Sequence, residues 1–148
     1  MQRNEEYMQL ALSLARTAES KGEVPVGAVI VKDGEIIASA YNRREFGNDA
    51  TAHAELIAIR DACQKLGTWR LTGCELYVTL EPCPMCAGAI VNSRIDRVFY
   101  GAKDARGGAL GSVLDLRSYP LFSIPDVHGG LCKEDCRELL QGFFKKRR

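Results

Sequence analysis

Apolar positions recur every three or four residues in several stretches of the chain, which is the spacing of an amphipathic helix. Three such stretches predict helices over 4–20, 52–66 and 132–146. The segment 83–92 also has helical character. Gly22 follows the first of these stretches, and glycine commonly terminates a helix. We therefore expect four helices, two of them near the chain ends.

Runs of apolar and β-branched residues between these stretches predict strands. The segments 25–31 and 36–41 are separated by Lys-Asp-Gly-Glu, and Asp-Gly between two such runs is a strong hairpin signal. Buried strands are expected over 76–80 and over 97–100, with Gly101 ending the latter.

The remaining segments are polar or rich in glycine. The segment 42–49 predicts a loop, and 102–130 is the least regular part, with one short helical turn expected near Val113 and Leu114. A hairpin followed by alternating helices and strands predicts an α/β fold, in which a mixed sheet has helices on both faces. We expect one domain over 1–148, because this length suits a single core.

Composition narrows the classes of protein. The 148 residues are 46% hydrophobic with a net charge of +1, which excludes intrinsic disorder. The longest apolar runs, such as 29–31 and 87–91, are far shorter than the ~18 residues of a membrane span. No apolar signal segment follows Met1, so we expect a soluble, cytoplasmic protein with no membrane partner. The basic end, 145–148, is either a solvated helix terminus or a contact for RNA phosphates.

The six cysteines are better interpreted as metal or catalytic residues than as disulfides, because cytosolic thiols stay reduced. Cys83 and Cys86 have the Cys-x-x-Cys spacing at a predicted helix start, where amides and the helix dipole favour thiolates. By itself this spacing is also typical of a redox pair or half of a structural zinc site. His128, Cys132 and Cys136 could form a second metal site, although spacing on one helix face favours buried packing.

A histidine and a glutamate at another predicted helix start complete the candidate centre. His53 with Cys83 and Cys86 gives three zinc ligands, and no fourth ligand is evident nearby, so the pattern favours an open, catalytic site. Zinc lowers the pKa of water to ~7, and such chemistry needs a proton carrier. Glu55, two residues after His53, is the candidate, although alone it would most often be a solvated acid.

His53-Ala54-Glu55 with Pro82-Cys83-Pro84-Met85-Cys86 resembles the zinc-dependent cytidine and adenosine deaminase superfamily, whose signature combines these motifs. The segments 24–31, 76–90 and 99–104 and the basic end look like its bacterial tRNA adenosine deaminase branch, and the likeness covers nearly the whole chain. It implies a three-layer α/β/α cytidine-deaminase-like fold with about five strands. It also implies a homodimer and one Zn²⁺ per subunit.

The resemblance implies hydrolytic deamination of adenosine to inosine at the wobble position of a tRNA anticodon stem-loop. His53, Cys83 and Cys86 correspond to the ligands and Glu55 to the general acid/base. The expected substrate-binding residues are Asn42, Ala54, Asp104 and Phe144, with Asn42 against the flipped base, Asp104 beside the anticodon loop, and Phe144 able to stack on a base. Further phosphate contacts would come from scattered cations, namely Arg43, Arg44, Arg70, Arg94, Lys103 and Arg106.

Two other functions fit the same motifs. A free-base or nucleoside deaminase acting on guanine, cytosine or cytidine would use the same zinc core. A zinc-stabilised RNA-binding module, or a catalytically idle subunit of a dimer, would need the metal but not Glu55. Trp69, Tyr41 and Phe143 are expected to pack in the core.

Overall fold

The computed structural model describes residues 2–147, and the side chains of residues 3–147. The elements in chain order are α1 (Gln2–Ser20), β1 (Gly27–Lys32), β2 (Glu35–Tyr41), α2 (Ala54–Leu66), β3 (Cys74–Leu80), α3 (Pro84–Asn92), β4 (Arg97–Ala102), the 3-10 helix η1 (Leu116–Ser118), β5 (Asp126–Gly129) and α4 (Lys133–Lys146). None of these helices has the length and apolar character needed to cross a membrane. Arg148, the last cation of the expected basic end, lies outside the described residues.

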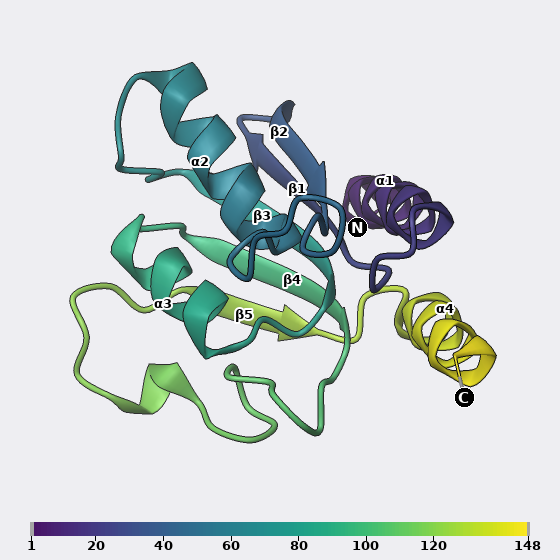
Figure 1. Cartoon of the computed structure of the whole chain (residues 1–148). Coiled ribbons are helices and arrows are strands. Elements are labelled where there is room, and N and C mark those ends of the chain that lie inside the picture. The colour runs from purple at the N-terminus through teal and green to yellow at the C-terminus, as the bar shows by residue number, and fades with distance from the viewer. Residues whose placement is uncertain (1, 148) are drawn as a thin grey trace.

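The strands form one mixed sheet in the order β2-β1-β3-β4-β5. Strand β1 is antiparallel to both of its neighbours, whereas β3, β4 and β5 run parallel. Helices α2 and α3 cover one face of the sheet, and α1 and α4 cover the other (Figure 1). The predicted three-layer α/β/α fold with a five-stranded mixed sheet is confirmed.

Each face of the sheet has its own apolar core, and β3 contributes to both. Leu76 and Val78 are fully buried against α2 and α3. On the opposite face, the Tyr77 ring lies between Tyr7 of α1 and Phe99 of β4, with ring centroids 5.1 and 4.7 Å away. A strand buried on both faces carries apolar residues without alternation, which is why its sequence is almost continuously apolar.

The turn between β1 and β2 has the backbone that its sequence predicts. Asp33 and Gly34 have φ angles of 51° and 76°. A type I′ hairpin turn requires positive φ at both central positions, and Asp-Gly supplies it at little cost. The predicted hairpin is confirmed.

The segment 102–130 differs most from expectation. The helical turn expected near Val113 and Leu114 instead forms slightly later, as η1, and β5 was not predicted. Val127 packs against one core and the His128 ring stacks on Phe99 of the other at 5.1 Å, while the strand pairs with β4 alone. Backbone bonding at a sheet edge stabilises β5, and such bonding leaves no apolar pattern in the sequence.

Gly101 does not end β4, which continues to Ala102. A Cβ atom at Gly101 would lie 2.3 Å from Cys136 Sγ, so the glycine lets α4 approach the sheet closely. Cys136 is buried, as the core interpretation predicts. The expectation for Trp69 is wrong: its side chain is 52% exposed, and Arg70 stacks on its ring at 4.5 Å.

Candidate metal centre and active site

Helices α2 and α3 both begin at the candidate metal centre. His53 directly precedes α2 and Cys83 directly precedes α3, each with an extended backbone. Cys86 lies in the first turn of α3. The first N–H groups of a helix lack partners within it, and together with the helix dipole they stabilise negative charge at this point. Both cysteines therefore occupy positions that favour a thiolate.

Prolines fix how the chain enters α3. Pro82 follows the end of β3 and has no N–H with which to continue a strand ladder. Pro84 occupies the first turn of α3, where no N–H is needed. The Cys83 carbonyl accepts a hydrogen bond from the N–H of Ala87 at 2.8 Å and closes the first turn. The two thiols are thereby held at the same end of one helix.

The three candidate ligands converge on one point. His53 Nδ1 lies 3.6 Å from Cys83 Sγ and 3.5 Å from Cys86 Sγ. All three ligand atoms lie within 4.8 Å of one another. Tetrahedral zinc, with bonds of about 2.0–2.1 Å to nitrogen and about 2.3 Å to sulfur, would separate N and S by about 3.5 Å. The three residues therefore fit a zinc ion.

No second centre of this kind forms within residues 2–147. His53, Cys83 and Cys86 are the one group of three such side chains that this part of the chain brings together. His128 is exposed and lies 3.0 Å from an Asp126 carboxylate oxygen, away from any cysteine pair. The expected packing role of Cys136 accounts for its burial.

The two thiols share a hydrogen bond and ionise very differently as a result. The bond from Cys86, followed by the bond to His53, lowers the pKa of Cys83 to about 4 despite burial. The same bond to Cys83, together with burial, raises the pKa of Cys86. The bond to Cys83 raises the pKa of His53. One thiol thus loses its proton readily, and a bound cation has to displace the proton of the second.

Glu55 lies in the first turn of α2 and is only 4% exposed. Burial raises the pKa of Glu55 to about 7, against the opposing effects of its own backbone N–H and of the His53 charge. A carboxyl group with a pKa near neutrality can both accept and donate a proton at physiological pH. The structure thus places a proton carrier beside the three candidate ligands.

Asn42 and Ala54 are joined at the start of α2. Asn42 follows β2 and is 5% exposed. Its Oδ1 accepts a hydrogen bond from the N–H of Ala54 at 2.8 Å, and its Nδ2 donates to the Val24 carbonyl at 3.2 Å. Ala54 is fully buried between His53 and Glu55. Asn42 therefore fixes the backbone on which both functional side chains stand, and substrate contacts by Asn42 and Ala54 stay predictions.

Asp104 shapes the loop that follows β4. Its Oδ1 accepts hydrogen bonds from the N–H groups of Arg106 and Gly107, at 3.0 and 3.2 Å. The backbone N–H of Asp104 donates to Glu81 Oε1 at 3.1 Å. Since Glu81 lies two residues before Cys83, the Asp104 loop is attached directly to the ligand segment.

Phe144 and its helix lie on the other layer of the molecule. Phe143 is buried and Phe144 is half exposed on α4, as predicted, with their rings 5.3 Å apart. A cavity of about 500 Å³ connects this helix to the region of Asn42. Its walls come from the end of α1, the two loops flanking β1 and β2, and α4: Lys21, Gly22, Glu23, Val24, Asn42, Arg44, Glu45, Phe143 and Arg147.

Sequence reasoning missed two buried glutamates that organise loops. Glu23 is 1% exposed and accepts hydrogen bonds from the backbone N–H groups of Glu45 and Phe46, at 2.8 and 2.9 Å. Glu81 is 2% exposed and binds the loop after β4. The position of Glu81 between a buried strand and Pro-Cys is a signal that could have found it. Nothing in the sequence marks Glu23.

Comparison with known proteins identifies the family that shares this geometry. Residues 1–102 match the family model described as the cytidine and deoxycytidylate deaminase zinc-binding region. The chain belongs to this family. It is a zinc-dependent deaminase by this membership, and His53, Cys83 and Cys86 are positioned to bind the zinc ion of the family.

Several similar proteins within the family are named as deaminases of adenosine in tRNA. A tRNA-specific adenosine deaminase of Bacillus subtilis is 50% identical over 149 aligned positions, covering 100% of this chain and 92% of that protein. One of Aquifex aeolicus is 49% identical, covering 97% and 95%. A solved structure from a study of A-to-I editing by tRNA:A34 deaminases has a TM-score of 0.89 and 51% identity, covering 91% of this chain and 99% of that chain.

A guanine deaminase is more distant. The structure of guanine deaminase from Nitrosomonas europaea has a TM-score of 0.79 and 26% identity, covering 94% of this chain and 83% of that chain. The same fold therefore occurs in enzymes that act on different bases.

Replacing any one candidate ligand should abolish zinc binding. We expect His53→Ala, Cys83→Ala and Cys86→Ala each to lose the bound zinc and to lower the melting temperature, since metal binding contributes to folding stability. Zinc content measured by elemental analysis on purified protein, alongside thermal unfolding, checks this. His128→Ala and Cys63→Ala are matched controls outside the centre and should keep zinc. Retention of zinc by all three ligand variants would refute the assignment.

Proposed function

We propose that the protein deaminates adenosine to inosine at the wobble position of a tRNA anticodon. One observation carries the proposal: the identity of about 50% to tRNA-specific adenosine deaminases extends over the whole chain. The zinc motifs lie within residues 1–102, a region shared by deaminases of different bases. Similarity that continues through 103–148 includes Asp104 and α4, which are the parts expected to contact RNA. A tRNA substrate also favours a cytoplasmic location.

In this proposal His53, Cys83 and Cys86 hold the zinc ion beside Glu55. When bound, zinc supplies the Lewis acidity that makes water a nucleophile near neutral pH. Glu55 accepts a proton from the water that attacks C6 of adenine. Glu55 delivers this proton to N1 and then carries the remaining hydroxyl proton of the attacking water to the departing amino group, so that ammonia leaves and C6 becomes a carbonyl carbon. The pKa of about 7 at Glu55 suits both transfers.

Residues on two sides of the centre support binding of the RNA. Asn42 and Ala54 lie at the first turn of α2, Asp104 lies in the loop bonded to Glu81, and Asn42 also lines the cavity that reaches α4. Arg44 and Arg147 bring positive charge to the cavity walls, and Lys145 and Lys146 are exposed at the end of α4. Cations in these positions can neutralise phosphates of a single-stranded anticodon loop.

The deciding assay uses an anticodon stem-loop with adenosine at the wobble position. The wild-type zinc enzyme should convert this adenosine to inosine, and Glu55→Ala should lower turnover at least 10²-fold, the usual range for losing a general acid or base. Zinc content and melting temperature of Glu55→Ala should match the wild type, which distinguishes catalysis from folding. Absence of inosine from a fully zinc-loaded wild-type enzyme would reject the proposal.

A free-base deaminase is the alternative that a specific observation supports, because the guanine deaminase of Nitrosomonas europaea shares the fold. The same enzyme preparation tested on guanine, cytosine and cytidine separates the two functions. Ammonia release from a free base faster than from the stem-loop would favour this alternative. The idle-subunit interpretation predicts that Glu55→Ala has no effect on any substrate.

Phe144 should contribute to RNA binding by stacking. We expect Phe144→Ala to raise KM for the stem-loop about fivefold or more, since stacking of one base is worth about 1–3 kcal/mol. The value of kcat should change little, because Phe144 is on α4 and does not belong to the ligand cluster. Leu10→Ala is the control, an exposed apolar side chain on α1, and should leave KM unchanged. An unaltered KM in Phe144→Ala would show that Phe144 does not contact the RNA.

We further propose that the chain forms a homodimer. The segment 113–124 exposes five large apolar side chains, namely Val113, Tyr119, Leu121, Phe122 and Ile124, and Phe122 is 81% exposed. An apolar surface of this density in a short segment is typical of a protein interface. A second copy of the chain is the partner that the resemblance to the homodimeric deaminase branch implies.

Light scattering coupled to size exclusion tests this dimer. The wild type should elute at twice the chain mass, and Phe122→Ser should shift the equilibrium toward monomer. Leu10→Ser, an exposed apolar position on α1 in the opposite layer, should leave the mass unchanged. A wild type that is monomeric at the highest concentration tested would rule the dimer out.

A further inference from the structure

The strongest unexplained feature is the buried carboxylate of Glu81. It follows β3, is 2% exposed, and lies between that strand and the Pro82-Cys83 segment. No cationic side chain among residues 3–147 bonds to it. Instead its two oxygens accept hydrogen bonds from the backbone N–H groups of Asp104, Leu110 and Ser112, at 3.1, 3.0 and 3.1 Å, and from the Ser112 hydroxyl. A buried charge is tolerated when its hydrogen bonds are satisfied in this way.

All four donors belong to one loop, which runs from Lys103 to Ser112. Two backbone bonds run alongside them: the N–H of Glu81 donates to the Ala102 carbonyl, and the N–H of Ala109 donates to the Pro82 carbonyl, each at 2.9 Å. The loop is therefore folded onto residues 81–82, immediately before the first cysteine ligand.

The loop also approaches the carboxylate too closely for any side chain. A Cβ atom at Gly108 would lie 2.3 Å from Glu81 Cδ. Glu81 could make room only by leaving its hydrogen bonds. At the preceding residue, Gly107, a Cβ atom would lie 3.6 Å from Asp104 Oδ2, which is an ordinary van der Waals distance.

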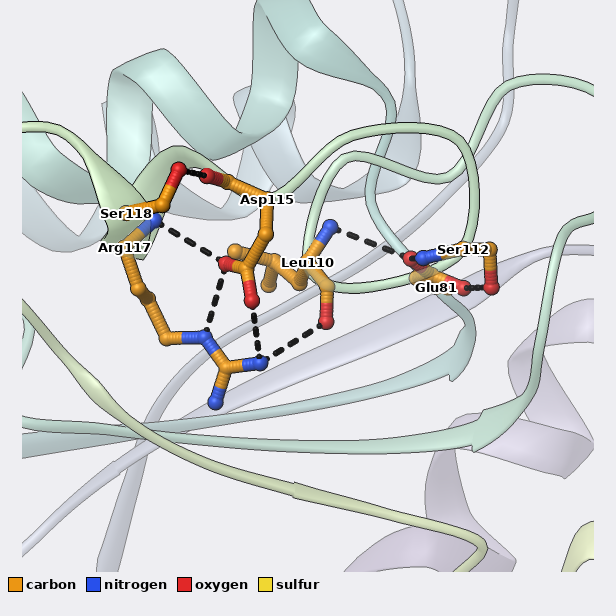
Figure 2. A network of polar contacts seen from close by, with 6 residues as sticks. All are labelled: Glu81, Leu110, Ser112, Asp115, Arg117 and Ser118. Atoms are coloured by element: carbon orange, nitrogen blue, oxygen red, sulfur yellow. Dashed lines mark hydrogen bonds and ion pairs between the residues drawn. The ribbon is translucent and has the colours of Figure 1, made fainter.

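A second set of bonds continues from the same point. Arg117 Nη2 donates to the Leu110 carbonyl at 3.2 Å, and the Arg117 guanidinium binds both carboxylate oxygens of Asp115. Figure 2 shows this series of contacts from Glu81 through Leu110 to Arg117, with Ser118 bonded to the Asp115 carbonyl. Glu81 thus binds the loop at both of its ends, and the bond from Arg117 to Leu110 also ties the loop to η1.

We infer that Glu81 is a positioning residue, which holds the 103–112 loop in the conformation that presents Asp104 to the substrate. The carboxylate does this through hydrogen bonds and does not itself touch the metal ligands. Its role in substrate binding rests on the proposed function, whereas its hold on the loop does not. A glutamine in its place keeps the shape but replaces one acceptor oxygen by an N–H₂ group facing backbone N–H donors. Glu81→Gln should therefore loosen the loop and leave the zinc centre in place.

Limited proteolysis measures the hold on the loop without reference to activity. Lys103 and Arg106 are exposed trypsin sites within the loop. In the zinc-loaded protein, Glu81→Gln should be cut at these two sites about tenfold faster than the wild type, as expected from losing hydrogen bonds to a charged group. Glu75→Gln makes the same change on β3, the strand that precedes Glu81, where Glu75 pairs with Arg97 at the partly exposed end, and should be cut at the wild-type rate. Mass spectrometry identifies the cleaved bonds.

Gly108→Ala disturbs the same contact from the loop side and provides a second variant, should Glu81→Gln fold poorly. It should be cut faster at Lys103 and Arg106, while the neighbouring Gly107→Ala should not. Equal cleavage of all variants would overturn the inference. So would loss of zinc from Glu81→Gln, because the carboxylate would then support the metal centre and not the loop.

Kinetics on the stem-loop adds the functional readout. Glu81→Gln should raise KM about tenfold or more with kcat changed by less than about threefold, a split that general destabilisation of the enzyme would not produce. A fall in kcat at unchanged KM would overturn the positioning role. If the wild type makes no inosine, the proposed function fails while the cleavage result still decides whether Glu81 holds the loop.

Discussion

The active arrangement depends on two helix starts meeting at one edge of the sheet. Helix α2 begins beside His53 and α3 begins beside Cys83, so the partial positive charge of both helix ends faces the same small volume. This field favours thiolates, and the two helix starts place three ligand atoms within 4.8 Å of one another. The sheet makes the meeting possible, because it places the ends of β2 and β3 where each helix must begin.

The site could be located from the sequence because its members are encoded locally. Cys83 and Cys86 share one helix turn, and His53 and Glu55 flank one helix start, so short motifs determine most of their relative placement. The hairpin at Asp33 and Gly34 was predictable for the same reason. In contrast, β5 is stabilised by pairing with β4 across a long connection, and no local pattern records that pairing.

Interactions between distant segments account for the features that sequence reasoning missed. Glu81 reaches donors more than twenty residues away, and Glu23 does the same for Glu45 and Phe46. Trp69 was expected in the core because of its apolar surface. Its ring is instead exposed, and the guanidinium groups of Arg70 and Arg94 stack on it. Glutamate side chains are usually exposed and tryptophan side chains are usually buried, and these residues do the opposite. Only the assembled fold therefore reveals them.

The packing of α4 against the first helix has a practical consequence for handling the protein. The Arg147 guanidinium lies over the Phe143 ring and 3.8 Å from where a Cβ of Gly22 would be, so the last described residue stands at the rim of the cavity. The described amino end lies at the opposite end of α1, a helix of 19 residues and thus about 28 Å long. An affinity tag or fluorophore fused after α4 would crowd the cavity rim, whereas the same label fused before α1 would stand well clear of it.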